Sequence, residues 1–320
     1  MRKQLTILCF FAIAICFVSC SDAPENLPDS YRVTKLELSA SGQIKDMIFP
    51  DDSLWLVCGG TKNTLGYIYT SHDQGNSWHQ CHDAQHVSIN TLFFSDEAGF
   101  WAGGDSIRLW RSEDGLSWYD NPRAPCYWDN CENPYYDLHV WNKHHVFAVG
   151  GEYFQRGITS ESGTGVSYWI QLYWRNQWND MHVDGYDVII AGYGMIIQST
   201  DTVETFDDMN VAGENFTALS KNQKNELHML AEQGKIYRLK NNTWKLTGEV
   251  KGRYRDMAFY HNYGVVVGDD ACLAISKDNG SSWTQYNFVC DRHLSCVKST
   301  GSGFLIGSRS GNLYLLEVEN

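Results

Sequence analysis

A degenerate internal repeat constrains the fold of this chain more than any other feature. Each copy has a short apolar segment, a second segment ending in glycine, and a third ending in Ser-x-Asp, followed by a turn and usually Trp. The first segments begin near residues 44, 89, 136, 179, 215, 254 and 294. Such spacing is typical of four-stranded propeller blades. The sequence therefore predicts an all-β fold, a seven-bladed β-propeller of four-stranded blades.

The last copy ends after three strand-like segments. Residues 31–38 alternate between apolar and polar side chains and belong to no copy. We expect this N-terminal strand to pair with the last blade and close the ring, since closure removes exposed sheet edges. Aromatic residues make up 14% of the 320 residues, with 28 glycines and only 20% charged residues, which fits an all-β chain rather than a helical bundle.

The turn after the third segment follows the pattern Ser-x-Asp-x-Gly-x-Ser/Thr-Trp. Residues 71–78 and 276–283 match fully, residues 112–118 are one position shorter, and residues 199–206 are degenerate. The Asp carboxylate is expected to accept turn N–H groups, the Gly to permit positive φ, and the Trp to pack between sheets. We assign structural roles to Asp73, Trp78, Asp114, Trp118, Asp201, Asp278 and Trp283.

Taken together, the inner-strand Asp-Met/Leu, the following Gly-Gly step and this Asp-box turn resemble a known family. They are similar to bacterial BNR/Asp-box repeat propeller lipoproteins and to the photosystem II assembly-factor propellers. The resemblance covers about residues 42–320. It implies a scaffold that binds a partner, and it identifies blades rather than a ligand.

The N-terminal residues predict that the protein is exported to the cell envelope. Arg2 and Lys3 precede a short apolar run that ends in Ser19-Cys20, which resembles a bacterial lipobox. We therefore predict a signal peptide over residues 1–19, lipidation of Cys20, a tether to residue 30, and the propeller over residues 31–320. Ser21 after the Cys favours the outer membrane.

Export places the cysteines in an oxidising compartment. Cys126 and Cys131 lie close together in a loop-like stretch and are the predicted disulfide. The pairing of Cys58, Cys81, Cys272, Cys290 and Cys296 stays open. No Cys-x-x-Cys pair is present, so no metal site is predicted.

Charge and missing motifs narrow the function. The net charge of −13 argues against nucleic acid as a partner. The sequence has no glycine-rich cofactor fingerprint, so no cofactor is expected. It also lacks the Phe/Tyr-Arg-Ile-Pro element that an Asp-box sialidase needs.

Two histidines are the candidate acid–base residues. The segments Asp-Leu-His-Val and Asp-Met-His-Val occupy the same inner-strand position of neighbouring blades and contain Asp137, His139, Asp180 and His182. Such a group at a channel mouth is suited to acid–base chemistry. The alternative interpretation is that both imidazoles simply pack between blades.

Two irregular aromatic segments, residues 122–136 and 153–178, interrupt the repeat. Long loops on a rigid scaffold often carry binding residues. An aromatic stacking face for a sugar or peptide and a cap on the propeller core are both compatible with this composition. The candidate ligand-binding residues are Tyr127, Trp128, Tyr153, Trp169 and Trp174.

We therefore predict a lipid-anchored, non-catalytic interaction or assembly module for a protein or glycan partner. The alternative is a carbohydrate-active enzyme, either a glycoside hydrolase or a polysaccharide lyase, with its site at the channel mouth. The oligomeric state is left open.

Overall fold

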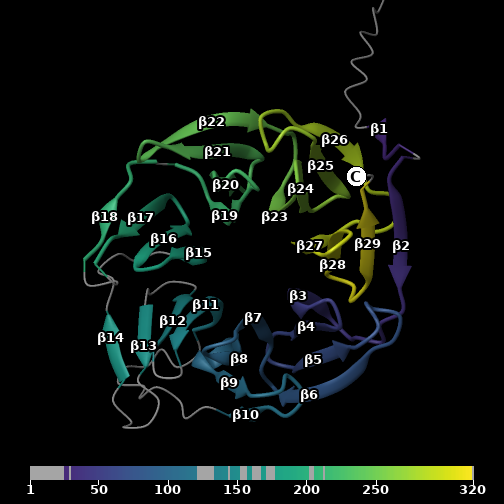
Figure 1. The fold of residues 1–320 in the computed structure, drawn as a ribbon, viewed down its shortest axis with the longest axis vertical. Helices are drawn as coiled ribbons and strands as arrows, with labels where there is room; N and C mark the ends of the chain where they lie inside the picture. The colour runs from purple at the N-terminus through teal and green to yellow at the C-terminus, as the bar shows by residue number, and fades with distance from the viewer. Residues whose placement is uncertain are drawn as a thin grey trace, which may run out of the picture.

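The computed structural model describes residues 25–28, 30–120, 133–142, 145–151, 157–160, 167–170, 177–201, 205–211 and 213–318. Their strands form seven sheets arranged around a central channel (Figure 1). The protein is an all-β propeller with four-stranded antiparallel blades. Five sheets use consecutive strands only, because the chain turns back after each strand, and the sixth and seventh sheets each add one strand from the N-terminal part of the chain.

The first sheet contains β3 (Gln43–Asp51), β4 (Leu54–Thr61), β5 (Leu65–Ser71) and β6 (His79–Gln85). The second contains β7 (Ile89–Ser95), β8 (Gly99–Gly104), β9 (Leu109–Ser112) and β10 (Tyr119–Asp120), with the 3-10 turn η1 (Asp105–Ile107) after β8. The third contains β11 (Tyr135–Asn142), β12 (His145–Gly150), β13 (Gly157–Ser160) and β14 (Ser167–Ile170). The fourth contains β15 (Trp178–Asp184), β16 (Asp187–Gly192), β17 (Met195–Ser199) and β18 (Asp207–Asp208).

The fifth sheet contains β19 (Phe216–Lys221), β20 (Leu227–Ala231), β21 (Lys235–Lys240) and β22 (Thr243–Glu249). The sixth contains β23 (Tyr254–Tyr260), β24 (Tyr263–Gly268), β25 (Cys272–Ser276), β26 (Thr284–Asn287) and, as a fifth strand, β1 (Glu25–Asn26). The seventh contains β27 (Leu294–Ser299), β28 (Gly303–Ser308), β29 (Leu313–Glu317) and β2 (Arg32–Leu36).

The sixth sheet corrects the prediction of four strands in every blade. Six sheets have four strands, and this one has five because β1 pairs in parallel with β26, with Glu25 opposite Tyr286 and Asn26 opposite Asn287. Residues 20–30 were expected to be only a tether. The outer strand of a sheet offers unpaired N–H and C=O groups, and β1 occupies such an edge.

Strand β2 adds antiparallel to β29 over five residue pairs, from Arg32–Glu317 to Leu36–Leu313. The last and first sheets are also in contact, since the Ser295 hydroxyl donates a hydrogen bond to the Ile44 carbonyl (2.6 Å). These contacts join the two ends of the chain.

The hydrophobic core lies between neighbouring sheets rather than at one centre. One cluster combines Val57 and Tyr67 of the first sheet with Leu305 and Leu313 of the seventh. The second strand of each sheet is almost wholly buried because sheets cover both of its faces; an example is β24, with Val265, Val266 and Val267 all at 0% exposure.

The turns with the Ser-x-Asp pattern are held together by their own side chains. Asp278 accepts hydrogen bonds from the Ser276 hydroxyl, the Ser282 N–H (both 2.8 Å) and the Ser282 hydroxyl (2.6 Å). Gly280 has a φ of +81°, the left-handed region that favours glycine. Asp73, Asp114 and Asp201 accept equivalent bonds. Trp78, Trp118 and Trp283 pack against the clusters between sheets.

Candidate functional site: the central channel and an arginine-rich face

The seven inner strands share one irregularity, and in four of them an aspartate that lines the channel follows it. Each of the seven has a bulge near its start, where the register with the second strand shifts by one residue. The residues directly after the bulge are Asp46, Thr91, Asp137, Asp180, Ala218, Asp256 and Cys296. The four Asp side chains line the channel, and we call them the carboxylate ring.

Each carboxylate of the ring bridges two neighbouring sheets. One oxygen accepts the backbone N–H of the next residue in its own strand, at 2.8 to 2.9 Å. The other oxygen accepts a backbone N–H from the inner strand of the following sheet, at 2.5 to 3.0 Å; the donors are Leu92 for Asp46, Met181 for Asp137, Leu219 for Asp180 and Val297 for Asp256. The carboxylate ring therefore fastens sheets to one another.

One lysine balances part of this buried charge. The Lys298 ammonium lies 3.3 Å from Asp46, and the charges of Asp46 and then of the other ring carboxylates hold its pKa well above the usual value. Its side chain is 44% exposed to the channel, although protein atoms surround it closely. Burial raises the pKa of Asp256 to about 6, and burial also raises the pKa of Asp137 and of Asp180. With one cation for four carboxyl groups, the channel floor stays acidic, although the raised pKa values of three of them reduce its negative charge.

A second set of side chains surrounds the mouth of the channel. They lie on the inner strands, two positions after the residues that follow the bulges. The set contains His139, His182, Phe93 and Ser220, and the cavity there has a volume of about 610 Å³. Burial lowers the pKa of His139 and of His182 to about 4, so both imidazoles are neutral at pH 7.

The structure brings the four sequence-predicted acid–base candidates together in adjacent sheets. Asp137 and Asp180 are occupied by backbone N–H groups, and His139 packs edge-on between Phe93 (4.9 Å) and Trp141 (5.1 Å). These contacts fit the alternative in which the residues pack between blades. Within the part of the chain that the structure describes, no three His, Cys, Asp or Glu side chains are arranged to hold a metal ion.

The predicted aromatic binding residues lie almost entirely outside the described residues. Trp169 belongs to β14, where its backbone pairs with Ile158. The others, together with the lipidation site and the predicted disulfide, are outside the described ranges: Tyr127, Trp128, Tyr153, Trp174, Cys20, Cys126 and Cys131. Cys58, Cys81, Cys272, Cys290 and Cys296 are free thiols.

Sequence analysis missed a cluster of arginines on the other face of the propeller, where the inner strands begin. Arg253, Arg255 and Arg309 share two carboxylates: Arg255 contacts Glu232 (3.0 Å) and Asp269 (2.6 Å), Arg253 contacts Glu232 (2.5 Å), and Arg309 contacts Asp269 (3.2 Å). Burial of Asp269 opposes its ionisation, but the hydrogen bond and charge of Arg255 lower its pKa below the ordinary value. Three guanidinium groups thus share two carboxylates, and Asp270 and Asp291 lie in the adjoining loops.

Arg292 extends this cluster, with a side chain that is 80% exposed and 3.4 Å from Asp270. We call Arg253, Arg255, Arg292 and Arg309 the arginine face. Its members come from loops and strand ends of the sixth and seventh sheets, so no single sequence segment displays the pattern. In the sequence these four arginines are simply part of the 25 basic residues of a chain with net charge −13, so nothing there marks them as a cluster.

Comparison with known proteins shows the fold. Neither a family model nor a characterised protein sequence matches the chain. Among solved structures, YCF48 bound to D1 peptide superposes with a TM-score of 0.70 at 14% identity, covering 93% of this chain and 99% of that one. The WD40 β-propeller domain of Doa1 gives 0.70 at 15% identity, covering 91% and 98%. Virginiamycin B lyase from Staphylococcus aureus gives 0.71 at 10% identity, covering 90% and 100%. At these identities the likeness is one of propeller architecture.

A search of the described residues for a helix with the length and apolarity needed to cross a bilayer finds none.

Proposed function

We propose that this protein is a lipid-anchored, extracytoplasmic interaction or assembly module that binds a protein partner through its arginine face. The proposal includes lipidation at Cys20, an outer-membrane location, and a place among Asp-box propeller lipoproteins. It also takes the seven sheets as blades of one ring that is closed where β2 adds to β29. A ring of this kind is a rigid platform for loops.

The arginine face carries the proposal. Guanidinium groups bind carboxylates in a bidentate geometry, and arginine is enriched at protein interfaces. Here Arg253, Arg292 and Arg309 keep 57%, 80% and 41% of their side chains exposed. Exposed guanidinium groups on a strongly acidic molecule favour contact with an acidic segment of a partner. The similar propeller YCF48 was solved with a bound peptide, which supports a peptide-binding role for the architecture.

The test is site-specific photo-crosslinking of the full chain in its native envelope. A photoreactive amino acid at Arg292 is expected to give a discrete protein adduct, because this position is the most exposed of the arginine face. The matched control is the same label at Lys245 on the outer strand β22. The pair R253E/R309E is expected to abolish the adduct, since it reverses the charge of two exposed side chains of the arginine face.

An adduct that persists in R253E/R309E, or the absence of any adduct from Arg292, contradicts the proposal. Lipidation is tested separately by labelled fatty acid incorporation, which Cys20→Ser is expected to abolish. Tyr127, Trp128, Tyr153, Trp169 and Trp174 stay proposed as additional contacts, checked by alanine variants in the same crosslinking assay. No contact among the described residues favours a hydrolase or lyase.

A further inference from the structure

Aromatic side chains line one side of the channel mouth, on the face opposite the arginine face. His139 lies between Phe93 and Trp141, with ring centroids 4.9 and 5.1 Å away and interplanar angles of 69° and 70°. Phe93 and His139 also line the cavity of about 610 Å³. The aromatic row therefore runs from the cavity to the rim.

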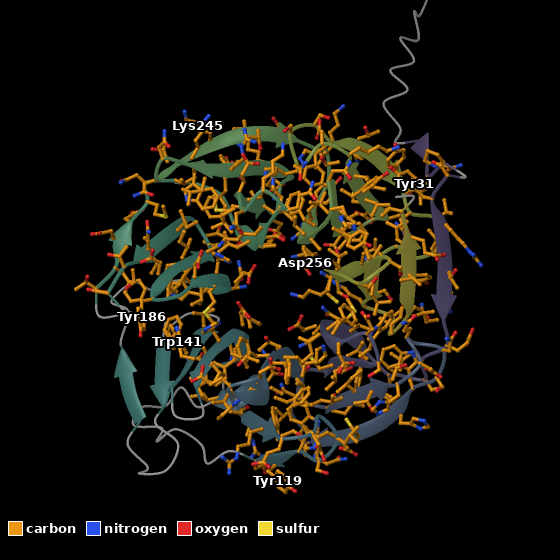
Figure 2. The ribbon with its side chains drawn as sticks, in the orientation of Figure 1. Tyr31, Tyr119, Trp141, Tyr186, Lys245 and Asp256 are labelled. Carbon is orange, nitrogen blue, oxygen red and sulfur yellow. The ribbon has the colours of Figure 1, made fainter. Side chains whose placement is uncertain are left out.

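Trp141 is held in place at the rim. Its indole N–H donates a hydrogen bond to the Gly185 carbonyl in the next sheet (2.9 Å). Gly185 has a φ of +62° in the turn between β15 and β16, and no atom lies within 4 Å of the Cβ position above it. Tyr186 follows in the same turn and is 68% exposed. Figure 2 shows Trp141 and Tyr186 on the same side of the ring. A fixed indole beside an exposed phenol forms a preorganised platform.

Polar groups suited to hydroxyls adjoin this platform. His139 and His182 are neutral at pH 7, and Nε2 of His182 is buried without a hydrogen-bond partner. Lys221 and Asp184 form an ion pair at 2.6 Å beside His182. Both imidazoles line the cavity, and a neutral imidazole has one nitrogen that donates and one that accepts a hydrogen bond, which suits sugar hydroxyls.

We infer that this mouth binds a neutral hexopyranose unit of a glycan, through a site formed by Phe93, His139, Trp141, His182 and Tyr186. The apolar C–H face of the sugar stacks on Trp141 and Tyr186, and its hydroxyls form hydrogen bonds with the imidazoles of His139 and His182. The carboxylate ring below repels acidic sugars. A cavity of this size with a mostly polar lining, next to exposed aromatic side chains at its rim, suits a small ligand that carries many hydroxyl groups. The site lies on the face opposite the arginine face and does not depend on the proposed protein partner.

The experiment titrates the mature chain with four neutral trisaccharides, namely cellotriose, maltotriose, mannotriose and triacetylchitotriose, and with anionic trigalacturonate. Tryptophan fluorescence and calorimetry report binding. At least one neutral sugar is expected to bind, and trigalacturonate is not. Trp141→Ala and Tyr186→Ala are each expected to weaken binding by about tenfold or more.

Tyr193→Ala is the matched control, because Tyr193 is 66% exposed in the same sheet but lies at the opposite end of β16. It is expected to leave binding unchanged. If Trp141→Ala proves unfolded, Trp141→Phe is used in its place. This variant keeps an aromatic ring but lacks the hydrogen bond to Gly185, and it is expected to retain part of the affinity for the sugar. The inference is overturned if no neutral sugar binds at about 10 mM, if trigalacturonate binds equally well, or if Tyr193→Ala loses as much affinity as Tyr186→Ala.

Discussion

His228 shows how a buried side chain contributes to the acid sensitivity of the protein. It is 0% exposed, its Nδ1 lies 3.2 Å from the Glu226 carbonyl, and its ring packs 4.8 Å from Phe259. Burial lowers its pKa to about 4, and Nε2 has no partner. The imidazole is therefore retained in its neutral form, and protonation opposes folding.

The sign of the pH effect follows from the lowered pKa. Above the unfolded value near 6.5 the stability contributed by neutral His228 is complete, and it is lost as pH falls toward 4 because only the unfolded chain takes up the proton. His228→Leu is expected to remove this loss, so that from pH 7 to 5 the variant gains about 2 kcal/mol relative to the native protein. Urea unfolding at both pH values measures it. An unchanged difference between the two proteins contradicts it.

At the scale of elements, β2 is an outer strand that lies far in sequence from the rest of its sheet. The outer strands of the first five sheets follow their neighbours in the chain, whereas β2 meets β29, and β1 meets β26, only by pairing across most of the sequence. Closing so long a loop costs entropy, which the five-residue ladder and the packing of Leu36 offset. The strand is therefore the weakest-tethered part of the seventh sheet.

Two prolines test this dependence. Successive N–H groups of a strand point to opposite edges, so T34P/K35P removes at least one N–H that pairs with β29. We expect the double variant to lose about 3 kcal/mol or more of unfolding free energy. The control K245P/L246P changes adjacent positions of the outer strand β22, which stays attached to β21 through its hairpin. We expect a smaller loss for the control in urea unfolding. Equal losses would show that β2 has no special role.

At the scale of the whole molecule, charges from four sheets meet a single lysine from a fifth. Asp46, Asp137, Asp180 and Asp256 fasten successive sheets, and Lys298 of the seventh sheet lies among them. The balance between these charges therefore depends on the assembly of several sheets and not on any single sheet.

Replacing that lysine is expected to weaken the protein most at neutral pH. Lys298→Met leaves four carboxylates without a cation, so at pH 7 we expect a loss of about 2 kcal/mol, reduced by the solvent that reaches the channel. Without the ammonium the pKa of Asp256 rises further above about 6, and protonation of the folded state then relieves the repulsion, so the loss shrinks at pH 5. Lys221→Met, which breaks a surface pair, is the control. A loss that grows toward pH 5 contradicts the account.

The local features of this protein follow from its sequence alone. Period-2 alternation and glycine-rich turns locate the strands, and the Asp turns form as expected because their hydrogen bonds join residues at most four positions apart. The recurrence of Asp before Met or Leu also locates the inner-strand position. The sequence further placed His139 and His182 in neighbouring sheets.

Only the tertiary structure determined what those positions meet. The register places Lys298 among carboxylates that lie 42 to 252 positions away in the chain, and no local pattern indicates that contact. The arginine face combines loops and strand ends of separate sheets, and Trp141 is fixed by a carbonyl of the next sheet. β1 joined the sixth sheet because an edge there had free backbone groups. Turn hydrogen bonds and the alternation of apolar and polar residues depend on residues that are close in sequence. Charge balance and binding surfaces arise only when the fold brings distant segments together.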